Sequence, residues 1–288
     1  MRASGRCYAS ERTVRKFIER LRWIAATLAP VLAKGFEKLG PIEMKPLIAQ
    51  ALHMGDECHN RNAAATSLLF KRFAPAALEA EVPQAQLAAA LRFWASNDHF
   101  FLNLSMATCK AMLDAGHGVK NSSLVTAMAR NGVRFGIRVS GTGDAWFQAD
   151  ASVVDGLYFP SFGPDDAAKD LGDSAITETA GIGAFAMAAA PAIVKFIGGT
   201  PSDALANTLA MTSITLGRND AFTLPTLNFA GTPGGIDVRS VVDTNIAPVI
   251  NTGIAHKDAG IGQIGAGITR APLHCFAQAV SKLAATVG

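Results

Sequence analysis

The sequence has few cysteines, and no two of them stand at a metal-binding spacing. The four cysteines, Cys7, Cys58, Cys109 and Cys275, lie far apart and form no CxxC pair. This spacing suggests neither a zinc cluster nor a disulfide framework. We therefore expect reduced thiols and a cytoplasmic location.

Charge is also scarce. Only 17% of the residues are charged and the formal net charge is +3, whereas 49% are hydrophobic, so the chain can bury a sizeable core. A basic group near the N-terminus lacks an accompanying RNA-binding motif, and we interpret it as the solvated face of an amphipathic helix. It consists of Arg12, Arg15, Lys16, Arg20 and Arg22. Nucleic acid is therefore not an expected partner.

The sequence lacks a convincing membrane segment. No apolar region follows the N-terminal charges, as a secretory signal would require. The longest apolar run, AGIGAFAMAAAPAIVKFIGG, is rich in glycine and alanine and contains Pro191 and Lys195. A helix buried in a folded core accounts for this run better than a membrane span, so no membrane association is expected.

Helical periodicity dominates the first part of the chain. Apolar residues that recur every three or four positions predict an amphipathic helix over residues 11–38, with a kink at Pro30. The same pattern, with its helix caps and prolines, predicts helices over residues 42–54, 63–73, 83–95 and 100–116. The helix over 63–73 is expected to end near Pro75, with a linking turn after it.

Beyond Val119 the pattern becomes mixed. It predicts a helix over 122–130, a strand over 133–139 with a glycine-rich turn after it, and a loop-rich region over 145–170. A buried alanine-rich helix and a helix over 201–214 follow, and a C-terminal helix begins at Pro272. Between them, short strands or loops are expected at 222–227 and 237–242, and buried strand and turn segments at 249–255 and 260–269. Neither repeats nor low-complexity linkers occur.

We therefore predict the α+β class, with a mostly helical N-terminal half packed on a mixed α/β C-terminal half. The predicted boundary separates a helical subdomain, residues 1–118, from a mixed subdomain, residues 119–288. Because no linker separates them, we expect one compact unit.

One short stretch, ALHMGDECHNRN at residues 51–62, is the densest in chemistry. If it is helical, its polar residues share one face and need partners or a ligand. Its candidate catalytic residues are His53, Asp56, Glu57 and His59, and its candidate anion-binding residues are Asn60, Arg61 and Asn62. The H-x2-D-x2-H spacing differs from HExxH and no third histidine lies nearby, so we predict no metal ion and no cofactor.

Four further clusters place polar groups beside apolar segments, and three of them also have a plainer interpretation. Asn97 fits a helix cap or an anion site, and Asp98 and His99 beside it are candidate catalytic residues. Arg130 and Asn131 fit equally a helix C-cap or an anion site. Glu178 and Thr179 are candidate anion-binding residues, because they precede a glycine-rich turn that could approach an anion. Asn251 and Lys257 as anion-binding residues, with His256 as a candidate catalytic residue, fit a ligand site at a strand end, and a solvated turn is the plainer interpretation.

Taken together, these clusters predict a single anion-binding pocket. An anion is bound by cations or N–H donors, and acid–base chemistry on it also needs a proton donor. Arginine, lysine and histidine side chains in the clusters supply such groups. We expect residues 53–62 and 251–257 to face a shared cavity.

Long strings from these same segments carry a resemblance to a known family. They are ALHMGDECHNRNAAATS, NDHFFLNLSMATCKAM, SSLVTAMARNGVRFGIRVSG, GDSAITETAGIGAFAMAAAPAIV and PVINTGIAHKDAGIGQIGAG. They are similar to the YlbE-like family, also called AllG-like, from about Val14 onward. That family supplies one subunit of the oxamate carbamoyltransferase of anaerobic allantoin breakdown, within purine degradation, and its members are encoded beside FdrA-type proteins.

The resemblance implies phosphorolysis of oxalurate to oxamate and carbamoyl phosphate, or an analogous step on another ureido acid. It also implies that FdrA-type and other carbamoyltransferase subunits are partners in an oligomer. Family members usually begin with a further domain, and only residues 1–12 precede the matching region here, so we expect a shortened or truncated member. Two alternatives stay open: an amide or ureido hydrolase that acts with or without a metal ion, and a non-catalytic scaffold subunit.

Overall fold

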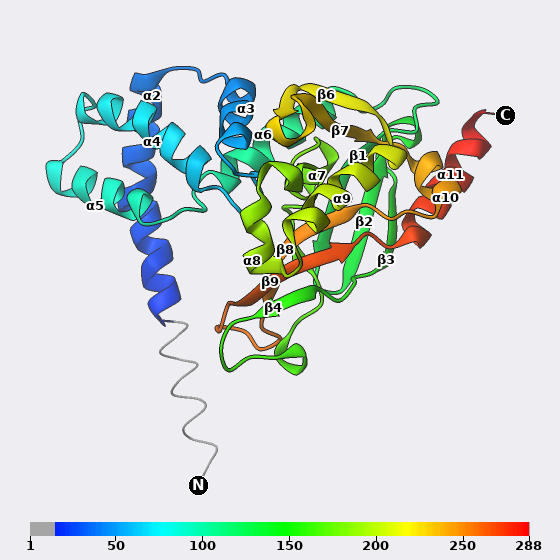
Figure 1. Cartoon of the computed structure of the whole chain (residues 1–288). Helices are drawn as coiled ribbons and strands as arrows, with labels where there is room; N and C mark the ends of the chain where they lie inside the picture. Colours follow the sequence, from blue (N-terminus) through cyan, green and yellow to red (C-terminus); the bar gives the residue numbers. More distant parts are fainter. Residues whose placement is uncertain (1–14, 288) are drawn as a thin grey trace, which may run out of the picture.

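The structure is a computed structural model that describes residues 15–287. The predicted helix start at residues 11–14 and Cys7 lie outside the described residues. Figure 1 shows helices gathered at the N-terminal side of the molecule and strands gathered at the C-terminal side, which confirms the predicted α+β class. Among the described residues, no helix combines the length and the apolar character that crossing a bilayer requires.

The first described helix begins at residue 15 and continues through a π-helical segment, η1 (Ile24–Leu28), into α2 (Ala29–Leu39). The N–H of Ala29 donates to the carbonyl of Ile24, five residues earlier. Pro30 comes directly afterwards and has no N–H to donate. The irregularity predicted at Pro30 is therefore taken up by a wider helical turn just before it.

Four helices complete the helical part. They are α3 (Met44–His53), α4 (Ala63–Leu78), α5 (Gln84–Ala95) and α6 (Leu102–Asp114). The prediction that the helix over 63–73 ends near Pro75 was wrong, because α4 contains Pro75 and continues to Leu78. Burial of Phe73 and Ala77 on this helix stabilises its last turns despite the missing proline hydrogen bond.

Aromatic rings fill the core between these helices. The ring of Trp94 stacks on Phe100 with centroids 3.8 Å apart and lies 4.8 Å from Phe73. A Cβ atom on Gly35 of α2 would lie 2.5 Å from the ring of Phe73. Glycine at this position therefore lets α2 approach α4 closely enough to bury the ring.

Three antiparallel sheets form the C-terminal part. The first has the order β3-β2-β1-β5, the second β4-β9-β8, and the third pairs β6 with β7. Their strands are β1 (Val125–Asn131), β2 (Arg134–Val139), β3 (Trp146–Asp150), β4 (Asp155–Tyr158), β5 (Leu171–Gly172), β6 (Thr215–Leu224), β7 (Ala230–Ile236), β8 (Val249–Ala255) and β9 (Gln263–Arg270). The strands predicted over 133–139 and 249–255 are confirmed.

Two other predictions for this part were wrong. The segment 122–130 forms strand β1 and no helix; it is buried on both faces, so its pattern does not alternate as in a half-exposed strand. The segment 237–242 lies mostly in helix α10 (Val238–Thr244), which Asp237 caps by accepting from the N–H of Arg239. Residues 145–170, predicted as loop-rich, contain the short strands β3 and β4 between irregular segments.

The alanine-rich run is not one helix. It follows a short helix, α7 (Ile176–Thr179), and divides into the 3-10 segments η4 (Gly183–Ala189) and η5 (Pro191–Ile193) and the helix α8 (Val194–Ile197). All of η4 is buried, as predicted for the run. Helices α9 (Pro201–Met211) and α11 (Leu273–Val287) confirm the two remaining helix predictions.

The helical part and the sheets meet along two helices. Helix α3 packs on β6, and α6 packs on α7 and β1. The apolar core of the helices continues across this boundary, since it includes Phe222 and Leu224 of β6. Segments from both parts can therefore line one cavity at the boundary.

Candidate functional site

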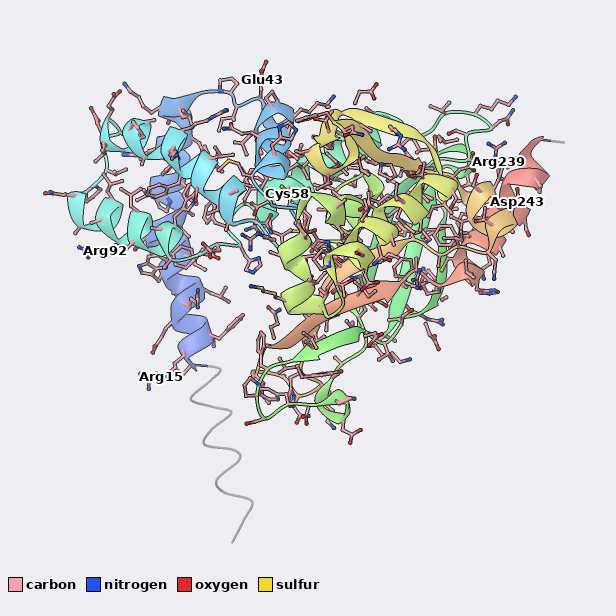
Figure 2. The ribbon with its side chains drawn as sticks, in the orientation of Figure 1. Arg15, Glu43, Cys58, Arg92, Arg239 and Asp243 are labelled. Carbon is pink, nitrogen blue, oxygen red and sulfur yellow. The ribbon has the colours of Figure 1, made fainter. Side chains whose placement is uncertain are left out.

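A cavity of about 640 Å³ opens at the boundary between the helices and the sheets. Its walls include residues 59–62 after α3, residues 98, 99 and 102 before and in α6, Ser174, and residues 252–255 of β8. The stretches 53–62 and 251–257 thus meet at one cavity, as the sequence predicted, although each contributes only part of its residues. Figure 2 labels Cys58, next to this wall, between the helices and the strands.

The chemistry-rich stretch is helical only as far as His53. It then turns sharply, with Gly55 at φ 93° and Cys58 at φ 61°. The N–H of Cys58 donates to the carbonyl of Arg61, and the buried Asp56 carboxylate accepts from the N–H of Ala65 in the first turn of α4. The conditional helix over the whole stretch was therefore wrong, and a compact turn delivers His59 to Asn62 to the cavity.

His59 is paired with a buried carboxylate. Its Nδ1 lies 2.8 Å from Oε1 of Glu178, and the same oxygen accepts from the backbone N–H groups of Ala184 and Asn251. Because two fixed donors already address this oxygen, Nδ1 is the donor in the pair. Nε2 of a neutral His59 then carries the lone pair of a base, as in carboxylate-oriented histidines.

A second buried carboxylate, Glu57, lies beside this pair. It accepts from the N–H of Arg61 at 2.6 Å and from the side-chain amide of Asn251 at 3.2 Å. The pKa of Glu57 is raised to about 7, chiefly by burial and also by the nearby Glu178, against the lowering effects of His59 and the two hydrogen bonds. Asn251 therefore connects both carboxylates, since its backbone N–H contacts Glu178 and its amide contacts Glu57.

The raised pKa of Glu57 predicts a pH-dependent stability. Between pH 4.5 and about 7, the unfolded chain releases this proton while the folded chain retains it. The free energy of unfolding of the wild type should therefore fall with rising pH across that window, by about 3 kcal/mol relative to Glu57→Gln. Urea unfolding of both proteins at matched pH values checks this, and parallel pH profiles would contradict it.

Arg61 supplies a cation to the cavity. Its Nε donates to the carbonyl of Gly55 at 2.9 Å and lies 3.5 Å from Oδ1 of Asp56, and its side chain is 37% exposed. No hydrogen-bond partner of its terminal Nη atoms occurs among the described residues. The guanidinium is thus anchored at its base, and its outer N–H groups are available for bidentate anion binding.

Arg130 lies behind the opposite wall in a buried ion pair. Its Nε donates to Oδ2 of Asp170 at 2.8 Å, with both side chains 1% exposed. Its Nη1 donates to Oγ of Ser174 and its Nη2 to Oγ1 of Thr252, which itself donates to Oδ1 of Asp170. Arg130 therefore orders this wall and does not reach the cavity as a free cation.

Four further predicted residues line the cavity. Asp98 and His99 lie at its exposed edge, and burial lowers the pKa of His99. Asn60 and Asn62 line the wall, and Nδ2 of Asn60 and Oδ1 of Asn62 are buried without a hydrogen-bond partner among the described residues. Asn62 stands at the N-cap of α4, but Asp56 performs the capping instead.

Other predicted residues lie away from the cavity walls and hold local structure. His53 contacts Thr223, Asn97 and Asn131 cap turns, Thr179 bonds Ile176, His256 lies near Asp166, and Lys257 bonds the carbonyl of Asp165. The plainer cap and turn interpretations describe these positions.

Asp170, Ser174 and Thr252 were not among the predicted site residues. Asp170 and Ser174 flank the two-residue strand β5, which pairs with the end of β1 at Arg130 and Asn131. The available signal was the polar segment KDLGDS at residues 169–174, where the predicted loop-rich region ends. In the part of the chain that the structure describes, no group of three or more His, Cys, Asp or Glu side chains is placed to hold a metal ion.

Comparison with known proteins gives consistent matches. The family profile described as "Oxamate carbamoyltransferase subunit AllG" matches residues 11–174. The chain is 49% identical over 263 residues to the uncharacterized protein YahG of Escherichia coli K12, covering 91% of this chain and 56% of that protein. It is 47% identical over 273 residues to the oxamate carbamoyltransferase subunit AllG of the same strain, covering 94% of this chain and 65% of that subunit.

A solved structure matches equally well. A conserved protein of unknown function from Enterococcus faecalis V583 superimposes with a TM-score of 0.92 at 47% identity, covering 94% of this chain and 65% of that chain. The present chain thus spans less than two thirds of the length of these relatives. By the family profile and by these similarities, the chain belongs to the AllG family.

Proposed function

We propose that this chain is a subunit of a carbamoyltransferase that cleaves a ureido acid such as oxalurate with phosphate, giving oxamate and carbamoyl phosphate. Membership of the AllG family supports the reaction class. The single structural observation that carries the proposal is the His59–Glu178 pair at the wall of a cavity that also presents Arg61. This combination offers a base and a cation to one bound anion.

The groups present suit the bond changes of this reaction. A phosphate oxygen attacks the ureido carbonyl carbon, and the bond from that carbon to the oxamate nitrogen breaks. Nε2 of His59 accepts the proton of hydrogen phosphate and returns it to the leaving nitrogen, so that no net proton is gained or lost. Glu178 stabilises the imidazolium between the two transfers.

Arg61 is the proposed anion-binding residue. Its outer N–H groups match the planar, two-oxygen edge of a carboxylate or the oxygens of phosphate. We further propose that the chain works in the cytoplasm within an oligomer containing FdrA-type and other carbamoyltransferase subunits. The name of the E. coli relative as a subunit supports such an assembly.

Turnover measurements separate this proposal from its alternatives. We expect phosphate-dependent release of oxamate from oxalurate when the chain is combined with an FdrA-type partner, and none from the chain alone. Cleavage by the chain alone and without phosphate would instead identify an amide or ureido hydrolase. Full turnover by a complex that carries His59→Gln would show that His59 is not needed for catalysis, and would favour a non-catalytic scaffold role for this chain.

A further inference from the structure

The hydroxyl group of Ser174 is held by its surroundings but has no acceptor. Its Oγ accepts from Nη1 of Arg130 at 3.1 Å. No acceptor for its hydrogen occurs among the residues that the structure describes, and Ser174 is a partly exposed residue of the cavity wall. The neighbouring hydroxyl of Thr252 differs, because it donates to Asp170.

Arg130 limits the directions available to that hydrogen. Because an N–H of the guanidinium points at Oγ, the hydroxyl hydrogen must point elsewhere. Arg130 itself is fixed by the buried Asp170 and by Thr252, so the orientation of Ser174 does not depend on a mobile side chain. A hydroxyl hydrogen restricted in this way, on a residue of the cavity wall, can donate to a ligand oxygen with little reorganisation.

Ser174 lies close in sequence to Glu178, the carboxylate that orients the proposed base His59. Ser174 begins the turn that leads into α7, where Glu178 orients His59. Thr177 ties the two together, since its hydroxyl contacts both the carbonyl of Ser174 and Oε2 of Glu178. Arg61 lies on the same cavity in the turn that also carries His59.

We propose that Ser174 is a ligand-binding residue that donates its hydroxyl hydrogen to an oxygen of the oxyanion bound in this cavity, with Arg130 as the positioning residue behind it. The ligand class is a small carboxylate or a phosphate. This inference rests on the proposed function, whose site it completes from the C-terminal part of the chain.

Calorimetric titration tests the inference with two probes, sodium oxamate and inorganic phosphate. The wild-type chain, alone and combined with an FdrA-type partner, is compared with Ser174→Ala. A neutral donor to a charged oxygen supports an expected increase in Kd of about 10- to 100-fold for the probe that Ser174 contacts. An increase for oxamate alone identifies the carboxylate as the partner, and an increase for phosphate alone identifies phosphate.

Two controls keep the test interpretable. Ser281→Ala removes an exposed hydroxyl on α11 that bonds only the carbonyl of Ala277, and should leave both Kd values unchanged. Ser174→Thr keeps a hydroxyl and should recover most of the affinity. Thermal unfolding without ligand reports whether Ser174→Ala is folded, and the shift caused by each probe is then measured from that variant's own baseline.

The outcomes that overturn the inference differ from those that overturn the function. Equal affinities of the wild type and Ser174→Ala for every probe that binds would overturn the role of Ser174, while phosphate-dependent turnover would still stand. Failure of the wild type to bind either probe in either preparation would overturn both the cavity as an oxyanion site and the role of Ser174.

Discussion

Replacement of His59 by glutamine is expected to lower kcat for phosphate-dependent cleavage of oxalurate by about 100- to 10,000-fold, the usual contribution of a positioned acid–base group. Glutamine can preserve a hydrogen bond to Glu178 but cannot exchange a proton near neutral pH. KM should change much less than kcat, since Arg61 and the opposite wall are left in place. Steady-state kinetics of the reconstituted complex measure both constants.

The control for this prediction is His53→Gln. His53 is an exposed histidine six residues earlier, whose Nε2 lies 2.9 Å from Oγ1 of Thr223 and whose ring meets Phe229 edge-on, away from the cavity walls. We expect it to retain kcat within about twofold, as a surface change remote from chemistry should. Unchanged turnover in His59→Gln, or equal losses in both variants, would refute the assignment of His59 as the base.

Replacement of Gly183 by alanine is expected to lower the free energy of unfolding by about 2–5 kcal/mol, the sum of a left-handed backbone penalty and overpacking in a filled core. Gly183 has φ 65°, and a Cβ atom there would lie 2.3 Å from Oε1 of Glu178 and 3.2 Å from Cβ of His59. The methyl group would push the carboxylate away from the imidazole. We therefore expect catalysis to fall together with stability.

Two matched glycines separate the causes of this effect. Gly143 has φ 63° but no atom within 4 Å of the added Cβ, so Gly143→Ala tests the backbone penalty alone. Gly217 has neither a positive φ nor a close neighbour, so Gly217→Ala should be near neutral. Urea unfolding of the three variants should rank Gly183→Ala well below Gly143→Ala. Equal losses at Gly183 and Gly143 would show that no collision with Glu178 occurs.

The sequence predicts the helical part of this fold well because each helix there buries one face. Residues such as Leu47, Ile48, Ala51 and Leu52 recur at helical spacing and are all buried. The same reasoning gives a wrong prediction for strand β1. It is buried on both faces, with the polar residues Thr126 and Arg130 among those buried, and the pairing that makes it a strand, for example Met128 with Ile137, comes from the neighbouring segment.

In the candidate site, too, residues could be predicted from their neighbours in the sequence, whereas their distant partners could not. His59 and Arg61 were predictable because a dense polar stretch beside apolar residues needs partners. Their environment was not. Glu178 pairs with His59 across 119 positions of sequence, and Asp170 pairs with Arg130 across 40, distances over which a single sequence holds no spacing rule. Local caps, by contrast, explain why Asn97 and Asn131 were attractive candidates.

The hydrogen bond between Asn251 and Glu57 joins residues 194 positions apart. On the ribosome, the helical half emerges first, with the turn that carries Glu57 and His59 but without strand β8. Non-local contacts of this kind form late, because the long intervening chain must lose conformational entropy before the contact can stabilise the fold. We therefore expect the cavity to be among the last parts of the molecule to assemble, so that the nascent chain is already helical before its candidate site forms.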